Sequence, residues 1–254
     1  MIMKKDMIAL ACVNLYAILG ALPKLCELDE EAAALIHDEH ISIGFAVKGG
    51  PWGTLIFEDG KCHMERGLVK PKILLPFSTP EKFNGMIDGT VTPIPRKGFL
   101  HIGFLLKKFM KLTDILTAYL RADKEALKDE EFFRKSTTLM LYVIAGAVAE
   151  LGNFDPVSRA SASYITDGVI RIAIDNGPAA TITAKDHILR SIPEDCETYT
   201  SYMRFADIRT ARALFDGEIN AVACIGTGEV RVGGMISQVD NVNRILDRVA
   251  MYLA

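Results

Sequence analysis

The stretch FDGEINAVACIGTGEVRVGGMISQVDNVNRILDRVAMYLA, Phe215–Ala254, decides the fold. Its pattern predicts a helix that ends at Gly217, an apolar strand, a glycine-punctuated strand over Glu229–Gly233, and an amphipathic helix from about Gln238. A related block, IDGTVTPIPRKGFLHIGFLLKKFMKLTDILTAYL, spans Ile87–Leu120. Each block contains a glycine-bounded stretch of six residues and ends in Tyr-Leu near the close of a helix. The sequence therefore predicts a tandem duplication of one structural unit.

Positions upstream of the two blocks also correspond. Gly50-Pro51 and Gly177-Pro178 lie 127 residues apart. The same offset of 127 residues aligns the alternating run Ile41–Val47 with Gly168–Ile174. The offset increases further along the chain, as loop insertions in the second half would cause. Identity between the halves is low, and coincidence among common residue types is the alternative. The predicted domains are residues 1–122 and 123–254.

The composition is apolar, with 50% hydrophobic residues and a mean hydropathy of +0.20. An interface between the halves, an oligomer contact or an apolar ligand cavity would account for this surplus. The five cysteines are scattered and form no CxxC pair. We therefore expect neither a disulfide framework nor a cysteine zinc site. Because disulfides are rare in a reducing compartment, we expect a cytoplasmic location.

The net charge of −3 is unevenly distributed along the chain. Residues 61–121 carry eleven Lys or Arg against four Asp or Glu, whereas both flanking stretches are acidic. This local excess predicts attraction to anionic head groups or phosphates. A solvated surface that keeps an apolar helix in solution is the alternative interpretation.

The N-terminus, MIMKKDMIALACVNLYAILGALPK, imitates a signal peptide because two lysines precede an apolar run. Asp6 and Asn14 interrupt the run, and a counterpart lies within the chain at Leu139–Leu151. We therefore expect two buried helices, too short or too interrupted to cross a membrane.

The remaining pattern of unit 1 predicts a strand meander, a helix, a fifth strand and a final helix. The expected strands are Ile41–Lys48, Thr54–Glu58, Lys61–Arg66, Lys72–Phe77 and Gly98–Gly103. The expected helices are Glu30–Asp38 with Asp29 as its cap, a helix from Ser78 as its cap to Gly89, and Phe104–Leu120. In the second half the expected elements are Val169–Asp175, Ala179–Ala184, a strand near Ile188, Thr198–Phe205 and the helix Ile208–Phe215 after Asp207.

No stretch of the sequence predicts catalysis, a metal site or a cofactor. His37-Asp38-Glu39-His40 lacks a third ligand at metal-binding spacing, and Cys62 and His63 would point to opposite faces of a strand. Gly226–Glu229 leads into a strand rather than a helix, so it does not fit a dinucleotide loop. We expect the protein not to be an enzyme by itself.

The order of these elements resembles the sterol carrier protein-2 family. The resemblance is carried by Gly49–Gly53, Asp59-Gly60, the helix ending at Asp88-Gly89, and Gly98–Leu105, and more weakly by the second half. It implies an α+β fold of two tandem sterol-carrier-like units, each with a five-stranded, mostly antiparallel sheet covered by helices. It further implies a non-catalytic carrier with a hydrophobic tunnel for sterols, fatty acids or acyl-CoA.

The apolar faces and this resemblance together give a predicted pocket. Its residues are Phe83, Met86, Ile102, Phe109 and Leu116 in the first unit, and Ile182, Phe205, Leu214, Val232, Met235 and Ile245 in the second. The predicted contacts with an anionic surface are Arg96, Lys97, Lys107, Lys108 and Lys111. A structural module with filled cores that forms a homo-oligomer is the main alternative, and a sensor for a non-lipid metabolite is another.

Overall fold

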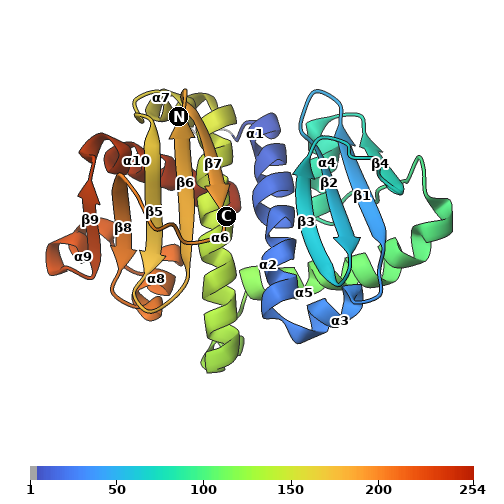
Figure 1. Ribbon diagram of the computed structural model, residues 1–254, viewed down its shortest axis with the longest axis horizontal. Coiled ribbons are helices and arrows are strands. Elements are labelled where there is room, and N and C mark those ends of the chain that lie inside the picture. The colour runs from blue at the N-terminus through green and yellow to red at the C-terminus, as the bar shows by residue number, and fades with distance from the viewer. Residues whose placement is uncertain (1–4) are drawn as a thin grey trace. The chain divides into compact units, whose positions relative to one another are not determined.

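The computed structural model describes residues 5–254, so Lys4 of the signal-like N-terminus lies outside the described residues. The chain divides into two compact units, unit 1 over Met1–Asp123 and unit 2 over Lys124–Ala254 (Figure 1). Each unit combines one mixed β-sheet with helices. The α+β class predicted from the sequence is confirmed.

Unit 1 contains a four-stranded sheet with the strand order β3-β2-β1-β4. β1 pairs antiparallel with β2 and parallel with β4. The strands are β1 Ile41–Val47, β2 Trp52–Glu58, β3 Lys61–Arg66 and β4 Ile73–Phe77. The α-helices are α1 Met7–Cys12, α2 Leu22–Leu28, α3 Glu30–Ile36, α4 Pro80–Ile87 and α5 Met110–Leu120. Val13–Ile18 and Phe104–Phe109 are π-helical, and Leu19–Ala21 and Phe99–His101 are 3₁₀-helical.

Unit 2 contains a five-stranded sheet with the order β7-β6-β5-β8-β9. The strands are β5 Gly168–Ile174, β6 Ala179–Lys185, β7 Ile188–Ile192, β8 Ser201–Phe205 and β9 Val230–Gly234. The α-helices are α6 Glu130–Phe154, α7 Pro156–Ala162, α8 Ile208–Phe215, α9 Ala221–Thr227 and α10 Ile236–Leu253, and Ala126–Lys128 is a 3₁₀ turn. α6 packs on β6 and β7, and α10 packs on β8 and β9.

The first four strands of the two units share one register. Ile43 pairs with Ile73 in unit 1, and Ile170 pairs with Ser201 at the corresponding positions of unit 2. The third-strand pairings correspond in the same way. Even a side-chain hydrogen bond recurs: Thr54 Oγ1 donates to the Gly67 carbonyl at 2.8 Å, and Thr181 Oγ1 donates to the Glu194 carbonyl at 2.7 Å.

Substitution of either threonine should destabilise the protein. We expect Thr54→Val and Thr181→Val each to lower the free energy of unfolding, by about 0.5–1.5 kcal/mol for every hydrogen bond removed. Both lose the bond to a loop carbonyl, and Thr54→Val also loses the bond that Thr54 Oγ1 accepts from Val69 N at 3.0 Å. Thr183→Val is the control, since its bond to Arg190 is exposed and 3.5 Å long. Urea unfolding of the three variants measures this, and a loss at only one of the two sites would contradict equivalent roles.

The predicted fifth strand of unit 1, Gly98–Gly103, is wrong. Residues Phe99–His101 form a 3₁₀ turn, and the only pairing beyond β4 among the described residues is an isolated bridge between Leu74 and Lys97. The backbone that bonds to β4 therefore lies earlier, at Arg96 and Lys97. Pro95 prevents this pairing from extending, because proline has no N–H to donate to a strand ladder.

Three smaller predictions also need correction. The predicted apolar strand before Glu229 is the helix α9, which Asn220 caps by accepting hydrogen bonds from Val222 N and Ala223 N. The cap of α4 is Thr79 rather than Ser78. The last helix begins at Ile236, two residues before the predicted start. The predicted cap at Asp29 is confirmed.

Two helical stretches are longer than the sequence pattern predicted. Met7–Leu28 and Glu130–Phe154 are long and apolar enough to cross a membrane by length and composition alone. In both, the majority of the most apolar window is buried, at 61% and 67%. Core helices of globular proteins pass the same test, so these helices by themselves do not indicate a membrane span.

Candidate functional site

The predicted pocket residues of unit 1 are distributed between its core and its surface. Three of the five are buried: Phe83, Phe109 and Leu116. The Phe45 ring lies 6.1 Å from the Phe83 ring and 6.2 Å from the Phe109 ring between centroids, so these aromatic side chains pack on one another. Met86 is half-buried and Ile102 is exposed. Ile102 therefore lies outside the core that the others share.

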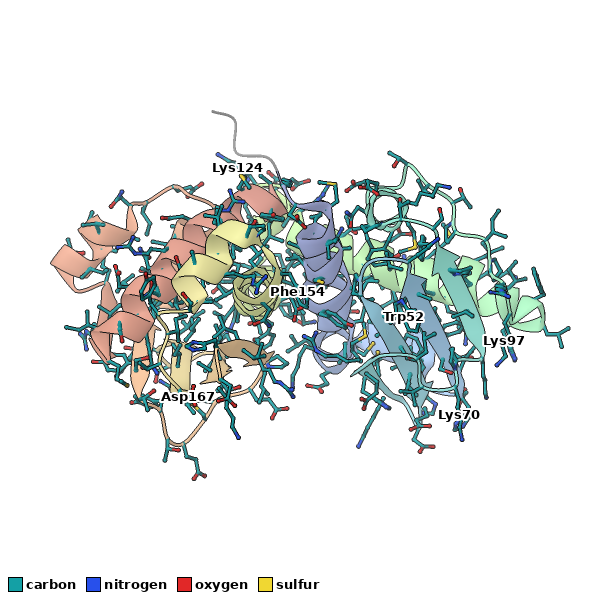
Figure 2. All side chains as sticks on the ribbon, turned by 90° about the horizontal axis from the view of Figure 1, so that it is seen from above. Trp52, Lys70, Lys97, Lys124, Phe154 and Asp167 are labelled. Atoms are coloured by element: carbon teal, nitrogen blue, oxygen red, sulfur yellow. The ribbon has the colours of Figure 1, made fainter. Side chains whose placement is uncertain are left out.

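The predicted residues of unit 2 follow the same division. Ile182, Phe205 and Ile245 are buried, Leu214 and Val232 are half-buried, and Met235 is exposed. Phe205 packs edge-on against Phe215, with the ring centroids 5.6 Å apart. Side chains occupy the space between the sheet and helices of each unit (Figure 2). The interior tunnel stays a prediction in both units.

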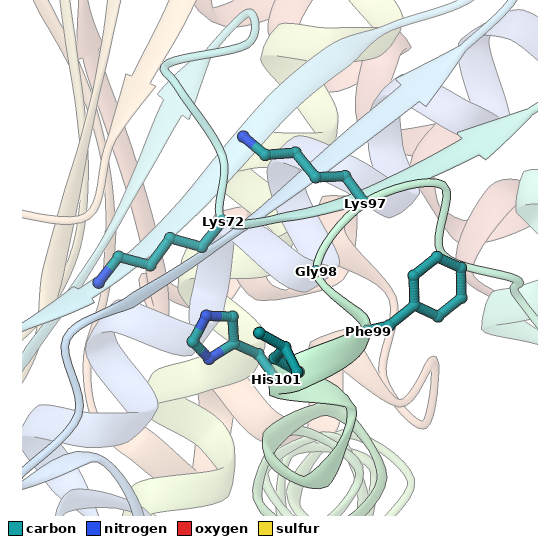
Figure 3. Close-up of a pocket in the computed structure, with 6 residues that line it drawn as sticks. Lys72, Lys97, Gly98, Phe99 and His101 are labelled. Atoms are coloured by element: carbon teal, nitrogen blue, oxygen red, sulfur yellow. The ribbon is translucent and has the colours of Figure 1, made fainter.

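An open pocket of about 440 Å³ lies at the β4 edge of unit 1. Its lining comes from the residue just before β4 and from the turn that follows the edge segment (Figure 3). The lining residues are Lys72, Lys97, Gly98, Phe99, Leu100 and His101. Lys97 belongs to the predicted cationic set. The other five were missed because Gly98–His101 were assigned to the expected strand Gly98–Gly103, and Lys72 to the expected strand Lys72–Phe77.

Gly98 sets the shape of this pocket. Its φ is +94°, in the left-handed region that favours glycine. A Cβ at this position would lie 2.5 Å from the Lys72 carbonyl oxygen and 2.8 Å from Ile73 Cα. The backbone beside it is held by two hydrogen bonds, from Leu74 N to the Lys97 carbonyl and from Arg96 N to the Leu74 carbonyl. A glycine here brings the turn against the sheet edge.

Two lysines and a histidine line the pocket together with Phe99 and Leu100, and Figure 3 shows both ammonium groups and the imidazole on one side of the turn and the Phe99 ring on the other. Lys97 Nζ donates to the Pro71 carbonyl at 2.9 Å, and Lys72 Nζ donates to the His40 carbonyl. Each ammonium has three N–H donors, so both retain capacity for an anion. Their aliphatic stems add apolar surface next to Phe99 and Leu100.

The predicted cationic residues have different surroundings. Lys108 pairs with Glu39 at 2.6 Å, and Lys111 pairs with Glu31 at 3.3 Å. These carboxylates offset part of the expected positive charge. Within residues 5–254, Arg96 and Lys107 are exposed, and their side chains form no hydrogen bond or ion pair. Arg96, Lys97 and Lys107 are therefore the members best able to meet an external anion.

The pocket residues Phe99 and Leu100 belong to a longer run of exposed apolar side chains. We define the apolar segment as residues 94–110, which contain six of them: Ile94, Phe99, Leu100, Ile102, Leu106 and Met110. Leu100 is 98% exposed and Phe99 is 62% exposed. Clustered apolar exposure of this kind is typical of a surface that binds a partner or a lipid.

The described part of the chain offers little for other chemistry. Residues 5–254 contain no group of three or more His, Cys, Asp or Glu side chains that could hold a metal ion. A hydrogen bond with the Cys26 thiol, together with burial, raises the pKa of the Cys62 thiol well above its ordinary value. That thiol is a poor nucleophile, since reactivity requires the thiolate.

Several solved structures resemble the chain, whereas no family model and no curated protein sequence matches it. A UbiJ-SCP2 ubiquinone synthesis protein is 20% identical, with a TM-score of 0.32 over 42% of this chain and 95% of that chain. The sterol carrier protein domain 2 of Helicoverpa armigera is 13% identical, with a TM-score of 0.36 over 44% and 89%. A crystal structure of sterol carrier protein 2 is 14% identical, with a TM-score of 0.33 over 43% and 92%. The predicted resemblance to sterol carrier proteins is confirmed, and it is a likeness of fold.

Proposed function

We propose that this protein binds lipids, and that the edge pocket of unit 1 takes an amphipathic lipid with an anionic head group, such as a fatty acid or an acyl-CoA. The observation that carries the proposal is the composition of the pocket, in which Phe99 and Leu100 stand beside Lys72, Lys97 and His101. A volume of about 440 Å³ lies within the ordinary range of small-ligand sites, roughly 300–1,000 Å³.

In this pocket the apolar groups contact the lipid tail and the charged groups contact its head group. The lipid tail lies on Phe99, Leu100 and the lysine stems, where burial of apolar surface supplies affinity. The head group receives hydrogen bonds from Lys97 and Lys72, since charge-assisted bonds are the stronger kind. The pocket is open, so part of the bound tail stays in contact with solvent.

Phe99→Ser should weaken the binding of a fluorescent fatty acid roughly tenfold, because it removes the largest apolar side chain of the pocket. Fluorescence titration in solution, without vesicles, measures the dissociation constant. Phe154→Ser is the matched control, since Phe154 is a partly exposed phenylalanine of unit 2. Equal binding by both variants would remove the edge pocket as the binding site.

A separate variant tests the proposed contact between Lys97 and the anionic head group. Lys97→Met retains an aliphatic stem and removes the ammonium, so it should weaken binding of a fatty acid and leave binding of the matching fatty alcohol unchanged. If Lys97→Met weakened binding of the fatty acid and of the fatty alcohol alike, Lys97 would have a structural role, through its hydrogen bond to the Pro71 carbonyl.

We further propose that the protein is a non-catalytic carrier, that it acts in the cytoplasm, and that its two units arose by internal duplication. The shared strand register supports duplication, as do the α4 and α8 caps, where Thr79 and Asp207 accept from the N–H three residues on. A carrier also needs contact with its lipid source, for which Arg96, Lys97 and Lys107 are available cations.

A self-associating module is the second candidate function. The observation in its favour is the exposed apolar segment, since Leu100 would be covered in an oligomer. Mass spectrometry of an organic extract of the purified protein, with light scattering at several concentrations, separates the two. Co-purified lipid in a monomer supports the carrier, and an empty protein whose mass rises with concentration supports the module.

A further inference from the structure

Unit 1 has an extension that unit 2 lacks, and it lies in the apolar segment. Gly98 and Gly234 occupy corresponding places, because a Cβ at Gly98 would meet the carbonyl of Lys72, and a Cβ at Gly234 would meet that of Thr200, the residue before β4 and β8 respectively. Both glycines have positive φ, +94° and +86°. Gly98 and Gly234 therefore provide equivalent reference positions for comparing α5 of unit 1 with α10 of unit 2.

The ends of the two helices also correspond. Tyr119 donates to Asp29, the cap of α3, at 2.7 Å, and Tyr252 donates to Asp155, the cap of α7, at 2.8 Å. Between the glycine and the tyrosine, unit 1 has three more residues than unit 2 (98 to 119 against 234 to 252).

The extra length emerges as the 3₁₀ turn and the π-helix before α5. α10 has neither and begins two residues after Gly234. In unit 1 the first residues after the glycine are all exposed: Phe99, Leu100, His101, Ile102 and Gly103. The start of the extension therefore exposes the apolar side chains Phe99, Leu100 and Ile102, whereas Phe104, Leu105 and Phe109 of the π-helix are buried.

Cations flank the exposed start of this extension on both sides. Arg96 and Lys97 precede the exposed residues 99–103, Lys107 follows them in the π-helix, and His101 lies among them. Among the described residues 94–110 there is no Asp or Glu. An apolar centre with a cationic rim is complementary to a bilayer whose head groups are anionic and whose interior is apolar.

We propose that residues 94–110 dock unit 1 on an anionic bilayer by inserting Phe99, Leu100 and Ile102 among the acyl chains, with Arg96, Lys97 and Lys107 at the head groups. This goes beyond the binding of a single lipid by the pocket. The charges supply a salt-dependent attraction that falls away within about a Debye length, roughly 8–10 Å at moderate salt. The inserted apolar side chains contribute a part of the binding free energy that salt does not screen.

Vesicle cosedimentation of the full chain tests the docking. Wild type should bind vesicles of phosphatidylcholine with phosphatidylserine, and a measurable part of this binding should persist at high salt. Leu100→Ser should lower the partition coefficient roughly tenfold or more, as expected for losing a buried leucine. Ile236→Ser is the matched control, because Ile236 also lies two residues after its glycine and is 82% exposed. That variant should bind as wild type does.

Insertion depth provides a second readout. In a Trp52→Phe background, which removes the single tryptophan, Leu100→Trp should give a fluorescence blue shift on anionic vesicles and be quenched by lipids brominated on their acyl chains. Ile236→Trp in the same background should show neither effect. Arg96→Glu/Lys107→Glu should weaken binding to anionic vesicles at low salt and leave the residual binding to neutral vesicles unchanged.

Four results would overturn the docking. They are no vesicle binding by wild type, equal loss in Leu100→Ser and Ile236→Ser, complete release by salt, and loss of an oligomer in Leu100→Ser with unchanged vesicle binding. The last would assign the segment to self-association. Titration with a fatty acid in the absence of vesicles reports on the pocket alone, so failure of the pocket and failure of the docking are separately visible.

Discussion

Arg248→Met should lower the free energy of unfolding of unit 2 by about 3–5 kcal/mol, the usual effect of removing one partner of a buried ion pair. Arg248 and Asp155 are 5% and 1% exposed. Methionine matches the arginine stem in length, so the variant changes charge and hydrogen bonding more than packing. The remaining Asp155 carboxylate would be buried with no cationic partner, which is the main source of the loss.

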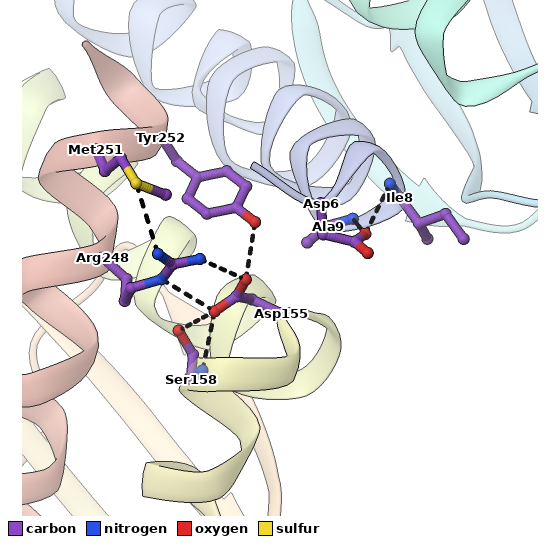
Figure 4. A network of polar contacts seen from close by, with 8 residues as sticks. All are labelled: Asp6, Ile8, Ala9, Asp155, Ser158, Arg248, Met251 and Tyr252. Carbon is purple, nitrogen blue, oxygen red and sulfur yellow. Dashed lines mark hydrogen bonds and ion pairs between the residues drawn. The ribbon is translucent and has the colours of Figure 1, made fainter. Parts of the chain in front are cut away.

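The contacts around Asp155 explain why this pair matters (Figure 4). Arg248 Nη2 donates to Oδ1 at 2.9 Å and Nε donates to Oδ2 at 3.2 Å. Tyr252 donates to Oδ1, and both the backbone N–H and the hydroxyl of Ser158 donate to Oδ2. One carboxylate thus joins α10 to the start of α7.

Equilibrium unfolding in urea measures the loss, and Arg244→Met is the matched control. Arg244 lies on the same helix and pairs with Asp240 at 3.0 Å, but both side chains are more than half exposed. Exposed pairs contribute only about 0–1 kcal/mol. Asp155→Asn/Arg248→Met should recover part of the loss, because it removes the unpaired charge. Equal effects of Arg248→Met and Arg244→Met would contradict the assigned role of the buried pair.

The pair also predicts how stability depends on pH. Burial raises the pKa of Asp155, but hydrogen bonds from Arg248, Ser158 and Tyr252 lower it more, so the net shift is downward. A lowered folded pKa contributes stability that is complete above the unfolded pKa, about 3.9, and is lost as pH falls through the folded value. The stability gap between wild type and Arg248→Met should therefore narrow in acid.

Gly98→Ala should abolish most of the lipid binding of unit 1, and it is the largest effect we expect on the site. A left-handed conformation costs a residue with a side chain roughly 1–2 kcal/mol. The new methyl group would also overlap the Lys72 carbonyl and Ile73 Cα, which are backbone atoms and cannot rotate away. The turn must then leave the sheet edge, and the pocket lining of Phe99 and Leu100 moves with it.

Gly103→Ala is the control for this substitution. A Cβ at Gly103 would meet nothing within 4 Å, and its backbone is right-handed helical at φ −60°. Fatty-acid titration should give near wild-type affinity for Gly103→Ala and at least a tenfold weaker one for Gly98→Ala. Circular dichroism verifies that both variants fold. Wild-type affinity in Gly98→Ala would show that the pocket does not depend on this turn.

The strands of both units could be predicted because their sequences alternate and their turns carry glycine or aspartate. Large apolar residues alternate with smaller or polar ones in Ile41–Val47, although nearly every residue of that strand is buried, and Asp59 takes the positive φ that its Asp-Gly turn favours. Helix caps were predictable to within a residue for the same local reason, as Thr79 in place of Ser78 illustrates.

The site could not be predicted because its residues imitate a strand. GFLHIG is a short apolar run bounded by glycines, which is typical of a strand, but its apolar residues Phe99, Leu100 and Ile102 are all exposed. The missing strand was signalled by Pro93 and Pro95, which lie where β4 would need a partner. A close approach such as that of Gly98 to Lys72 is a tertiary contact, and no local pattern encodes it.

Photocrosslinking with a diazirine fatty acid is the most direct test of where a lipid binds. Full-length protein is irradiated with the probe, and the modified peptides are mapped by mass spectrometry, with an excess of unlabelled fatty acid as competitor. We predict competable labelling centred on Lys97–His101. Labelling confined to the interior residues Phe83, Phe109 or Phe205, or labelling that the competitor does not reduce, would contradict the edge pocket as the lipid-binding site.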